Sequence, residues 1–271
     1  MRGSSRAAAR AVQEAFDAVL GGAVDRAGLG EDLFSVSAVI DSSPSLRRAL
    51  AAPSGEPAAK QALAERIFGG KVSGDAVRLV GAVAAARWAE EGDFADTVES
   101  LAVQSILSQA EREGRIDAVE DELFRFERII AGDTGLRDAL SSRNPDAEGK
   151  ARLVRRLLDG KAHPETIRLA EQAVQTPRGR RLDRIMESYL ALAAHRRDEL
   201  TALVTVATPL TEQQQARLRT ALERIYGKPV TLQIVIVESV VGGIRVQVGD
   251  EVVDGTVLRR LDEARRHITG S

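Results

Sequence analysis

Near the end of the chain, residues 237–261 read VESVVGGIRVQVGDEVVDGTVLRRL. Alternation of apolar and polar residues over 244–248 predicts a β-strand with one apolar face. Gly249 and Asp250 are typical of a two-residue hairpin turn, so we expect a second strand directly after them. A helix is expected to close the chain, because apolar residues then follow at helical spacing. These residues are Val257, Leu261, Ala264 and Ile268.

The residues before this stretch predict the other half of a small α/β module. Residues 200–207 are rich in valine and threonine and stop before a proline, as a strand would. Thr211 opens a capping box, and Gly227 stands where the C-terminal cap of the following helix belongs. Residues 230–237 predict a further β-branched strand. We therefore expect an α/β C-terminal module over residues 199–271, in the order strand, helix, strand, strand, strand, helix.

Residues 1–198 show the periodicity of helices rather than of strands. Apolar stripes at helical spacing recur along them, and glycine or proline clusters separate the stripes. The first stripe consists of Val12, Phe16, Val19 and Leu20. Aromatic residues make up only 3% of the chain, so alanine, leucine and valine are expected to form closely packed helix interfaces.

The helical region repeats itself when the sequence is shifted by ninety residues. Identical pairs under this shift include Leu33 and Leu123, Phe34 and Phe124, Lys60 and Lys150, Gly70 and Gly160, and Arg78 and Arg168. Loops align as well as helices, which chance rarely produces. We therefore predict a mostly α protein with two tandem, duplicated helical bundles, over residues 1–105 and 106–198, ahead of the α/β module. The helix around 93–112 is expected either to be shared between the copies or to run through their boundary.

The composition excludes several classes of function. The chain has 271 residues, a formal net charge of −2 and no cysteine. Disulfides, thiolate chemistry and cysteine metal sites are therefore excluded, and the global charge gives no reason to expect a nucleic acid as partner. No apolar run reaches the roughly eighteen residues that a membrane-spanning helix needs. The basic start resembles a transit peptide only weakly, because residues 6–20 already predict a helix of the fold.

The sequence offers no constellation for catalysis, a cofactor or a metal, and we expect none of the three. His163, His195 and His267 are isolated and lack the close pair that metal ligands normally show. Lysine follows the glycine pair at 69–70, but a phosphate-binding loop would need a strand before it. Tyr189 is the one aromatic residue among the arginines clustered between 178 and 197. A solvated helix face or an acidic protein partner is therefore favoured over RNA.

The C-terminal stretch resembles one family, the delta subunit of the F-type ATP synthase, called the oligomycin-sensitivity-conferring protein in mitochondria. The family pattern is Gly-Gly, an alternating strand, Gly-Asp, and Asp-Gly-Ser or Asp-Gly-Thr before an amphipathic helix. The matching residues are Gly242, Gly243, Gly249, Asp250, Asp254, Gly255 and Thr256. From the residues alone, these positions favour turns and helix capping. Family members usually carry one bundle, and the duplicated, arginine-rich form resembles the long delta subunits of actinobacteria.

This resemblance implies a structural subunit rather than an enzyme. A delta subunit joins the catalytic alpha/beta head to the peripheral stalk, or stator, so that rotor torque and hydrogen ion transport drive ATP synthesis. Its bundle binds N-terminal helices of alpha subunits, and its C-terminal module binds the end of the b subunit. We therefore expect one copy per complex, peripheral to the membrane at the cytoplasmic face of the plasma membrane.

The first candidates for contact with alpha are the stripe residues on the opening helix, where a partner helix would lie in a groove of the bundle. They are Val12, Phe16, Val19 and Leu20. The alternative is that this stripe forms bundle core, and the sequence leaves open which copy binds alpha. Two other classes of function remain. One is a helical-repeat scaffold or adaptor of another complex, and the other is an RNA-binding protein with steeply salt-dependent affinity.

Overall fold

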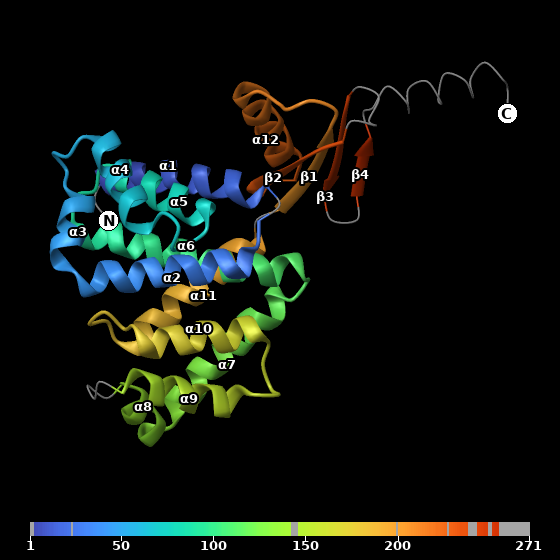
Figure 1. Cartoon of the computed structure of the whole chain (residues 1–271). Helices are drawn as coiled ribbons and strands as arrows, with labels where there is room; N and C mark the ends of the chain where they lie inside the picture. Colours follow the sequence, from blue (N-terminus) through green and yellow to red (C-terminus); the bar gives the residue numbers. More distant parts are fainter. Residues whose placement is uncertain are drawn as a thin grey trace, which may run out of the picture. The chain divides into compact units, whose positions relative to one another are not determined.

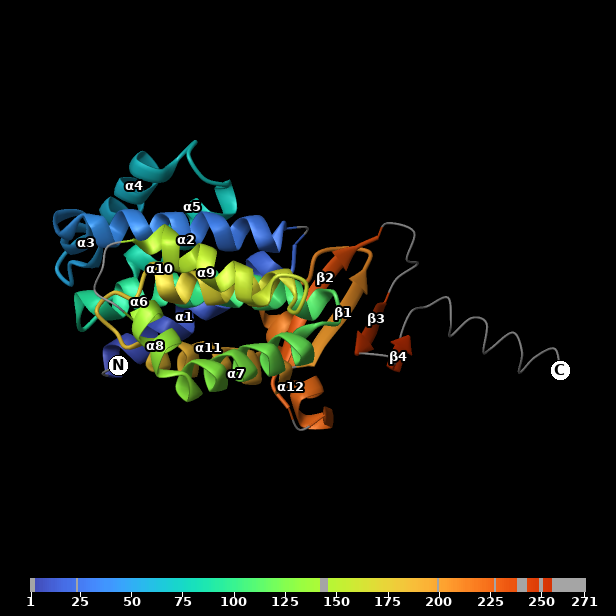
Figure 2. The same cartoon turned by 90° about the horizontal axis from the view of Figure 1, so that it is seen from below.

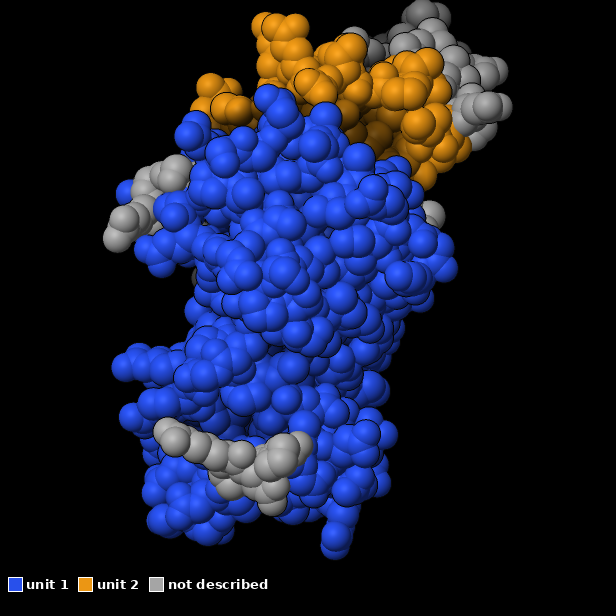
Figure 3. Space-filling model, turned by 60° about the vertical axis from the view of Figure 1, so that its left-hand side comes forward, with its two compact units in different colours: residues 1–15, 25–197 blue, residues 16–24, 198–271 orange. Residues whose placement is uncertain are grey.

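The computed structural model describes residues 3–22, 24–141, 146–198, 200–226, 228–237, 243–248 and 251–254. Most of these residues are helical, and the strands form one small sheet, which confirms the predicted fold class (Figures 1 and 2). Within these ranges, none of the helices has the length and apolarity needed to cross a membrane. The chain divides into two compact units, which Figure 3 colours separately. Unit 1 comprises Met1–Ala15 and Asp25–Arg197, and unit 2 comprises Phe16–Val24 and Asp198–Ser271.

The first part of the helical region contains the helices that correspond to the first predicted copy. They are α1 (Gly3–Leu20), α2 (Arg26–Ser42), α3 (Pro44–Ala51), α4 (Pro57–Phe68), α5 (Gly74–Ala85) and α6 (Glu91–Arg112). Local signals set several of their ends. Asp25 caps α2 by accepting a hydrogen bond from the backbone N–H of Gly28, and Ser73 caps α5 in the same way. Proline in the first turn of α3 and of α4 pre-sets the backbone for helix.

The next four helices repeat this order, and each begins and ends ninety residues after its counterpart. They are α7 (Ile116–Gly132), α8 (Thr134–Ser141), α9 (Ala147–Leu158) and α10 (Pro164–Gln175), which correspond to α2, α3, α4 and α5. Gly70 and Gly160 occupy equivalent connections and both have positive φ, at 71° and 67°. The duplication predicted from the sequence is therefore confirmed in the elements and in the backbone.

Helix α6 has two buried faces and belongs to both copies. One face corresponds, under the ninety-residue shift, to the buried stripe of α1. Its members are Ala95, Val98, Ala102, Ile106 and Ala110. The other face consists of the α6 residues that correspond to the buried residues of α11 (Leu182–Asp198) when the sequence is shifted by eighty-eight positions. Its members are Phe94, Thr97, Val98, Leu101, Ser105 and Ser108. Helix α6 packs beside α2, α7 and α10, so it closes the first copy and opens the second (Figure 2). The predicted boundary between residues 105 and 106 falls inside it.

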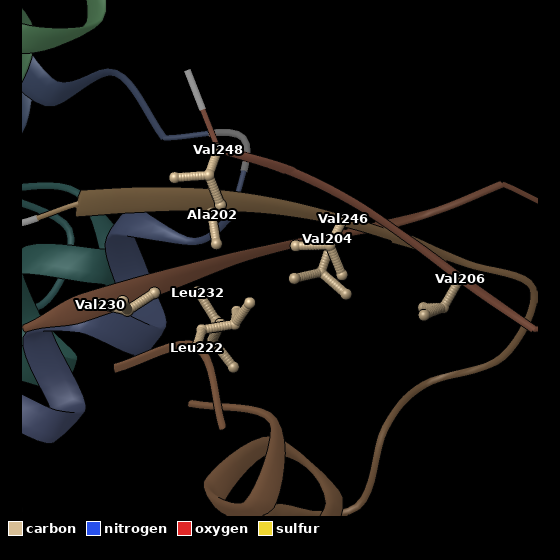
Figure 4. Close-up of a cluster of buried hydrophobic side chains, with 8 residues drawn as sticks. All are labelled: Ala202, Val204, Val206, Leu222, Val230, Leu232, Val246 and Val248. Atoms are coloured by element: carbon tan, nitrogen blue, oxygen red, sulfur yellow. The ribbon is translucent and has the colours of Figure 1, made fainter. Parts of the chain in front are cut away.

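The described part of unit 2 contains a four-stranded sheet with one helix on it. Its strands are β1 (Leu200–Val206), β2 (Val230–Ile236), β3 (Ile244–Val248) and β4 (Glu251–Asp254), in the order β2-β1-β3-β4. Strands β1 and β2 are parallel, and α12 (Glu212–Tyr226) supplies the crossover that parallel neighbours need. Strand β3 is antiparallel to β1 and to β4. Figure 4 shows the apolar cluster on the side of the sheet that faces Leu222 of α12.

The register of β3 and β4 agrees with the hairpin predicted for this stretch. Val248 pairs with Glu251, so the two residues between them form the whole connection. Val246 and Val248 are buried, whereas Arg245 and Gln247 are exposed, as the alternation predicts. The other predicted features lie outside the described residues: the cap at Gly227, the motif residues Gly242, Gly249, Asp250, Gly255 and Thr256, and the closing helix to Ile268.

Candidate partner-binding site

The stripe predicted to contact alpha lies along α1. Val12, Phe16 and Leu20 are at most 2% exposed, whereas Val19 is partly exposed. The three buried side chains are covered by the chain itself. Val19 is therefore the member of this stripe that offers surface to a partner.

A buried carboxylate ties the second copy to the shared helix inside unit 1. Glu99, on α6, is 3% exposed. Its carboxylate accepts hydrogen bonds from Arg180 Nη2 at 2.6 Å, from Arg178 Nη1 at 2.8 Å and from the Tyr189 hydroxyl at 3.0 Å. Two guanidinium groups and a phenol therefore donate to the carboxylate oxygens of Glu99. A buried charge needs such partners if it is not to destabilise the fold.

Arg178 reaches from the connection between α10 and α11 to helices of the first copy. Its Nε lies 3.0 Å from Oδ2 of Asp41 on α2, and its Nη1 lies 3.0 Å from Oδ1 of Asp96 on α6. The φ of Arg178 is 51°, in the left-handed region, which costs about 1–2 kcal/mol for a residue other than glycine. The ion pairs hold this turn, and the turn directs the guanidinium group between α2 and α6.

The environment of this network fixes the charge of its members. Burial, together with the neighbouring charge of Glu99, raises the pKa of Tyr189 well above its ordinary value. Burial lowers the pKa of Arg180, but the hydrogen bond and the charge of Glu99 outweigh it and raise the pKa overall. The phenol therefore stays protonated and the arginine charged near neutral pH. This network is suited to holding helices together and not to moving protons.

The other clustered arginines also pair within the chain. Arg196 Nε lies 2.8 Å from Glu111 Oε2, and its side chain is 7% exposed. Arg197 Nη1 lies 3.0 Å from Glu120 Oε2. The expectation of a solvated arginine face is therefore wrong for Arg178 and Arg196, because acidic residues distant in the sequence fold against them.

Glu122 on α7 holds the start of α10, a role that the sequence analysis missed. Its carboxylate accepts hydrogen bonds from the backbone N–H of His163 at 2.9 Å and from the Thr166 hydroxyl at 2.5 Å. Burial raises the pKa of Glu122, but the hydrogen bonds from Thr166 and His163 outweigh it and lower the pKa. Asp32 does the same in the first copy, where it accepts from the backbone N–H of Ser73 at 2.8 Å.

The interpretation of His163 as an isolated residue is wrong, because its ring Nδ1 lies 2.7 Å from Glu122 Oε1. The two residues are 41 positions apart, so no local spacing could have indicated the pair. The contact positions a helix start. Within the described residues, no group of three or more His, Cys, Asp or Glu side chains is arranged to hold a metal ion.

The sheet of unit 2 has a second face, opposite to the apolar cluster around Leu222. The strand register places Val235 of β2 and Val252 of β4 on this face, where they are 42% and 37% exposed. Arg245 and Gln247 of β3 are exposed between them. Apolar side chains flanked by polar ones form a surface that a partner helix or strand can cover.

Two residues of the C-terminal motif lie within the described ranges. Gly243 has a φ of 91°, a conformation that favours glycine, as the predicted turn requires. Asp254 is the last residue of β4 and pairs in register with Arg245. Gly243 therefore lies directly before β3, and Asp254 lies at the end of the strand that pairs with it.

Comparison with known proteins gives matches over the whole chain. The family model of the ATP synthase delta (OSCP) subunit matches residues 103–268. A Kineococcus radiotolerans protein named ATP synthase subunit delta is 45% identical over 269 residues, which are 99% of this chain and 98% of that protein. A Streptomyces griseus protein of the same name is 45% identical over 271 residues and 100% of both chains. A chain of the Toxoplasma gondii mitochondrial ATP synthase hexamer matches 62% of this chain and 94% of its own, with 21% identity and a TM-score of 0.29.

Proposed function

This chain belongs to the ATP synthase delta (OSCP) subunit family, and we propose that it is a stator subunit that joins the catalytic alpha/beta head to the b subunit. The observation that carries the proposal is the similarity to ATP synthase delta subunits along the full length, which includes both helical copies and the α/β module. A joint of this kind keeps the head from turning with the rotor. Rotor torque then drives ATP synthesis.

The junction between the two helical copies suits a part that bears torque. Helix α6 is common to both copies, so no flexible linker separates them. The buried ion pairs of Glu99 with Arg178 and Arg180 connect the α10–α11 turn to α6. Breaking these contacts would leave the carboxylate of Glu99 in a buried site without its partners, which is unfavourable.

The two ends of the stator joint are assigned to different regions of the chain. The helical region (bundles over residues 1–105 and 106–198) binds the N-terminal helix of an alpha subunit, with Val19 at the edge of the contact. The module over residues 199–271 binds the end of the b subunit at the sheet face of Val235 and Val252. Two separate contacts in one chain raise the effective affinity of the whole joint.

The protein performs this role without catalytic residues, a cofactor or a metal of its own. What supports this part of the proposal is that Glu99, which is buried, forms ion pairs and Glu122, which is partly buried, holds a helix start. One copy lies at the cytoplasmic face of the plasma membrane, and it associates with the membrane through the rest of the complex.

The test is isolation of the tagged full-length chain from gently solubilised membranes of its native host, followed by mass spectrometry. Recovery of alpha, beta and b subunits, with one copy of this chain per complex, is the expected result. An untagged strain treated in parallel is the control. Recovery of an unrelated assembly or of RNA, without ATP synthase subunits, would replace the proposal with a scaffold of another complex.

A further inference from the structure

The same phenylalanine is buried in one helical copy and exposed in the other. Phe34 on α2 and Phe124 on α7 occupy equivalent positions of the repeat, and they are 3% and 51% exposed. Their neighbours Leu33 and Leu123 are both fully buried. The difference between the copies therefore concerns one face of the helix and not the placement of the whole helix.

Helix α2 has two buried stripes, and α7 keeps only one of them. The stripe that both share is Leu29, Leu33, Val36 and Ile40 on α2, and Val119, Leu123, Phe126 and Ile130 on α7. The second buried stripe of α2 consists of Arg26, Gly30, Phe34 and Ser37. Its counterparts on α7 are at least partly exposed, and they are Ile116, Glu120, Phe124 and Glu127.

The second copy itself supplies a side chain that stacks on Phe34. The guanidinium carbon of Arg168, on α10, lies 4.5 Å from the centre of the Phe34 ring. Its Nε and Nη2 donate to the two carboxylate oxygens of Glu31 at 2.5 and 3.0 Å. The acid and the aromatic ring are three residues apart and lie on one face of α2. They therefore hold one arginine by a bidentate ion pair and a cation–π contact.

Helix α7 repeats this arginine receptor, but within the described residues no arginine of another helix pairs with it. Asp121 and Phe124 stand ninety residues after Glu31 and Phe34, with the same spacing. Asp121 forms an ion pair with Arg125 one turn along the same helix, and both side chains are largely exposed. An exposed ion pair of this kind contributes little to stability. An incoming arginine can therefore replace Arg125 at Asp121 or bind Asp121 together with it.

We propose that the α7 face formed by Asp121 and Phe124 docks an arginine-bearing amphipathic helix of another subunit of the complex, in the way that α2 receives Arg168 of α10. That the helix belongs to another subunit of the complex rests on the proposed function. That it carries an arginine follows from the repeat. A second copy of this chain is the rival occupant, because Arg78 on α5 is the counterpart of Arg168 and is exposed. A head-to-tail contact between copies would, however, extend into a ring or a filament, which does not fit the one copy per complex that we propose.

The first test places a photo-crosslinking phenylalanine analogue at position 124 of the full-length chain in the purified ATP synthase. Ile129 is the matched control, since it is 56% exposed on the same helix and its counterpart Val39 is also exposed. The expected result is crosslinking from position 124, several-fold above position 129, to a helix of another subunit within one turn of an arginine. Crosslinking to a second copy, equal yields, or no crosslink in an assembled complex would overturn the inference and leave the proposed function intact.

A second test uses the isolated full-length chain, so it holds even if no complex is recovered and the proposed function fails. The probe is a synthetic peptide with the sequence of residues 162–177, AHPETIRLAEQAVQTP, compared with the same peptide carrying Arg168→Gln. We expect the arginine peptide to bind more tightly, on the order of tenfold, and Phe124→Ala or Asp121→Asn to remove the difference. Equal binding of the two peptides, or binding that Phe124→Ala leaves unchanged, would overturn the inference. Thermal unfolding followed by circular dichroism checks that both variants fold.

Discussion

Glu122 contacts the start of α10 through the backbone and ring of His163 and through Thr166, whereas its counterpart Asp32 accepts from the backbone N–H of Ser73. We expect Glu122→Gln to lower the free energy of unfolding at neutral pH by about 1–2 kcal/mol, because hydrogen bonds to a charged group are lost. Asp32→Asn is the matched control in the other copy, and its effect is expected to be smaller.

The lowered pKa of Glu122 also predicts how the stability of the protein depends on pH. Hydrogen bonds hold the folded pKa of Glu122 below its ordinary value of 4.5 despite the opposing effect of burial. Its contribution is therefore present above that pH and lost as the pH falls through the folded pKa. Chemical denaturation at a series of pH values measures this. The difference in free energy of unfolding between wild type and Glu122→Gln should narrow in acid. A difference that stays constant with pH would contradict this role of Glu122.

At Gly30, α2 approaches α6 so closely that an added methyl group has no room. A Cβ at Gly30 would lie 2.6 and 2.9 Å from side-chain atoms of Ile106 and 3.3 Å from the backbone oxygen of Ala102. We expect Gly30→Ala to lower the free energy of unfolding by about 1–3 kcal/mol, as overpacking does.

Gly81, inside α5, is the control for this substitution. Its added Cβ would meet only Gln61 Cγ, at 3.8 Å. We expect Gly81→Ala to raise the free energy of unfolding by about 0.5–1 kcal/mol, since alanine is the better helix former. Urea denaturation of both variants decides the matter, and a shift of the same sign in both would show that close helix contact is not what Gly30 serves.

Among the elements, the turn between α10 and α11 depends on one buried carboxylate of α6. Glu99→Gln removes the charge that Arg178 and Arg180 share, and we expect it to lower the free energy of unfolding by about 3–5 kcal/mol. Asp96 also pairs with Arg178, but its side chain is 51% exposed, so Asp96→Asn should cost no more than about 0.5 kcal/mol. Thermal unfolding compares the two, and hydrogen exchange in the turn should rise only in Glu99→Gln.

The helices and strands themselves were largely predictable, because their signals are local. The ninety-residue shift predicted a duplicated helical bundle, and the structure has four helix pairs whose bounds match residue for residue under this shift. Alternation over Ile244–Val248 predicted the buried face of β3. The contacts that join elements were not predictable, since they link positions far apart in the sequence. Glu99 with Arg180 and Glu122 with His163 are examples, 81 and 41 positions apart.

The candidate site was predictable only in part, for a related physical reason. A helical stripe such as Val12 to Leu20 shows which face is apolar, but not whether the chain or a partner covers it. The structure covers Val12, Phe16 and Leu20 and leaves part of Val19 accessible. In the same way, identical residues of the repeat meet different surroundings, as Phe34 and Phe124 do.

At the scale of the whole molecule, the proposed joint needs two contacts that can be broken one at a time. Val235 is 42% exposed on the open face of the sheet, and Ile225 is 68% exposed on α12. If the sheet face binds the b subunit, Val235→Asp buries a charge in that contact and should weaken binding at least about tenfold, whereas Ile225→Asp should not. Calorimetric titration of each full-length variant with the soluble part of the b subunit measures this difference.

Binding of the alpha helix gives the internal control, because it is assigned to the helical region. Val235→Asp should leave the affinity for a synthetic alpha N-terminal peptide unchanged, while Val19→Asp should lower that affinity and spare the b subunit. Equal losses at both contacts from either variant would mean that the two sites are not separate. The joint would then hold by one continuous surface, and its strength would not arise from two linked contacts in a single chain.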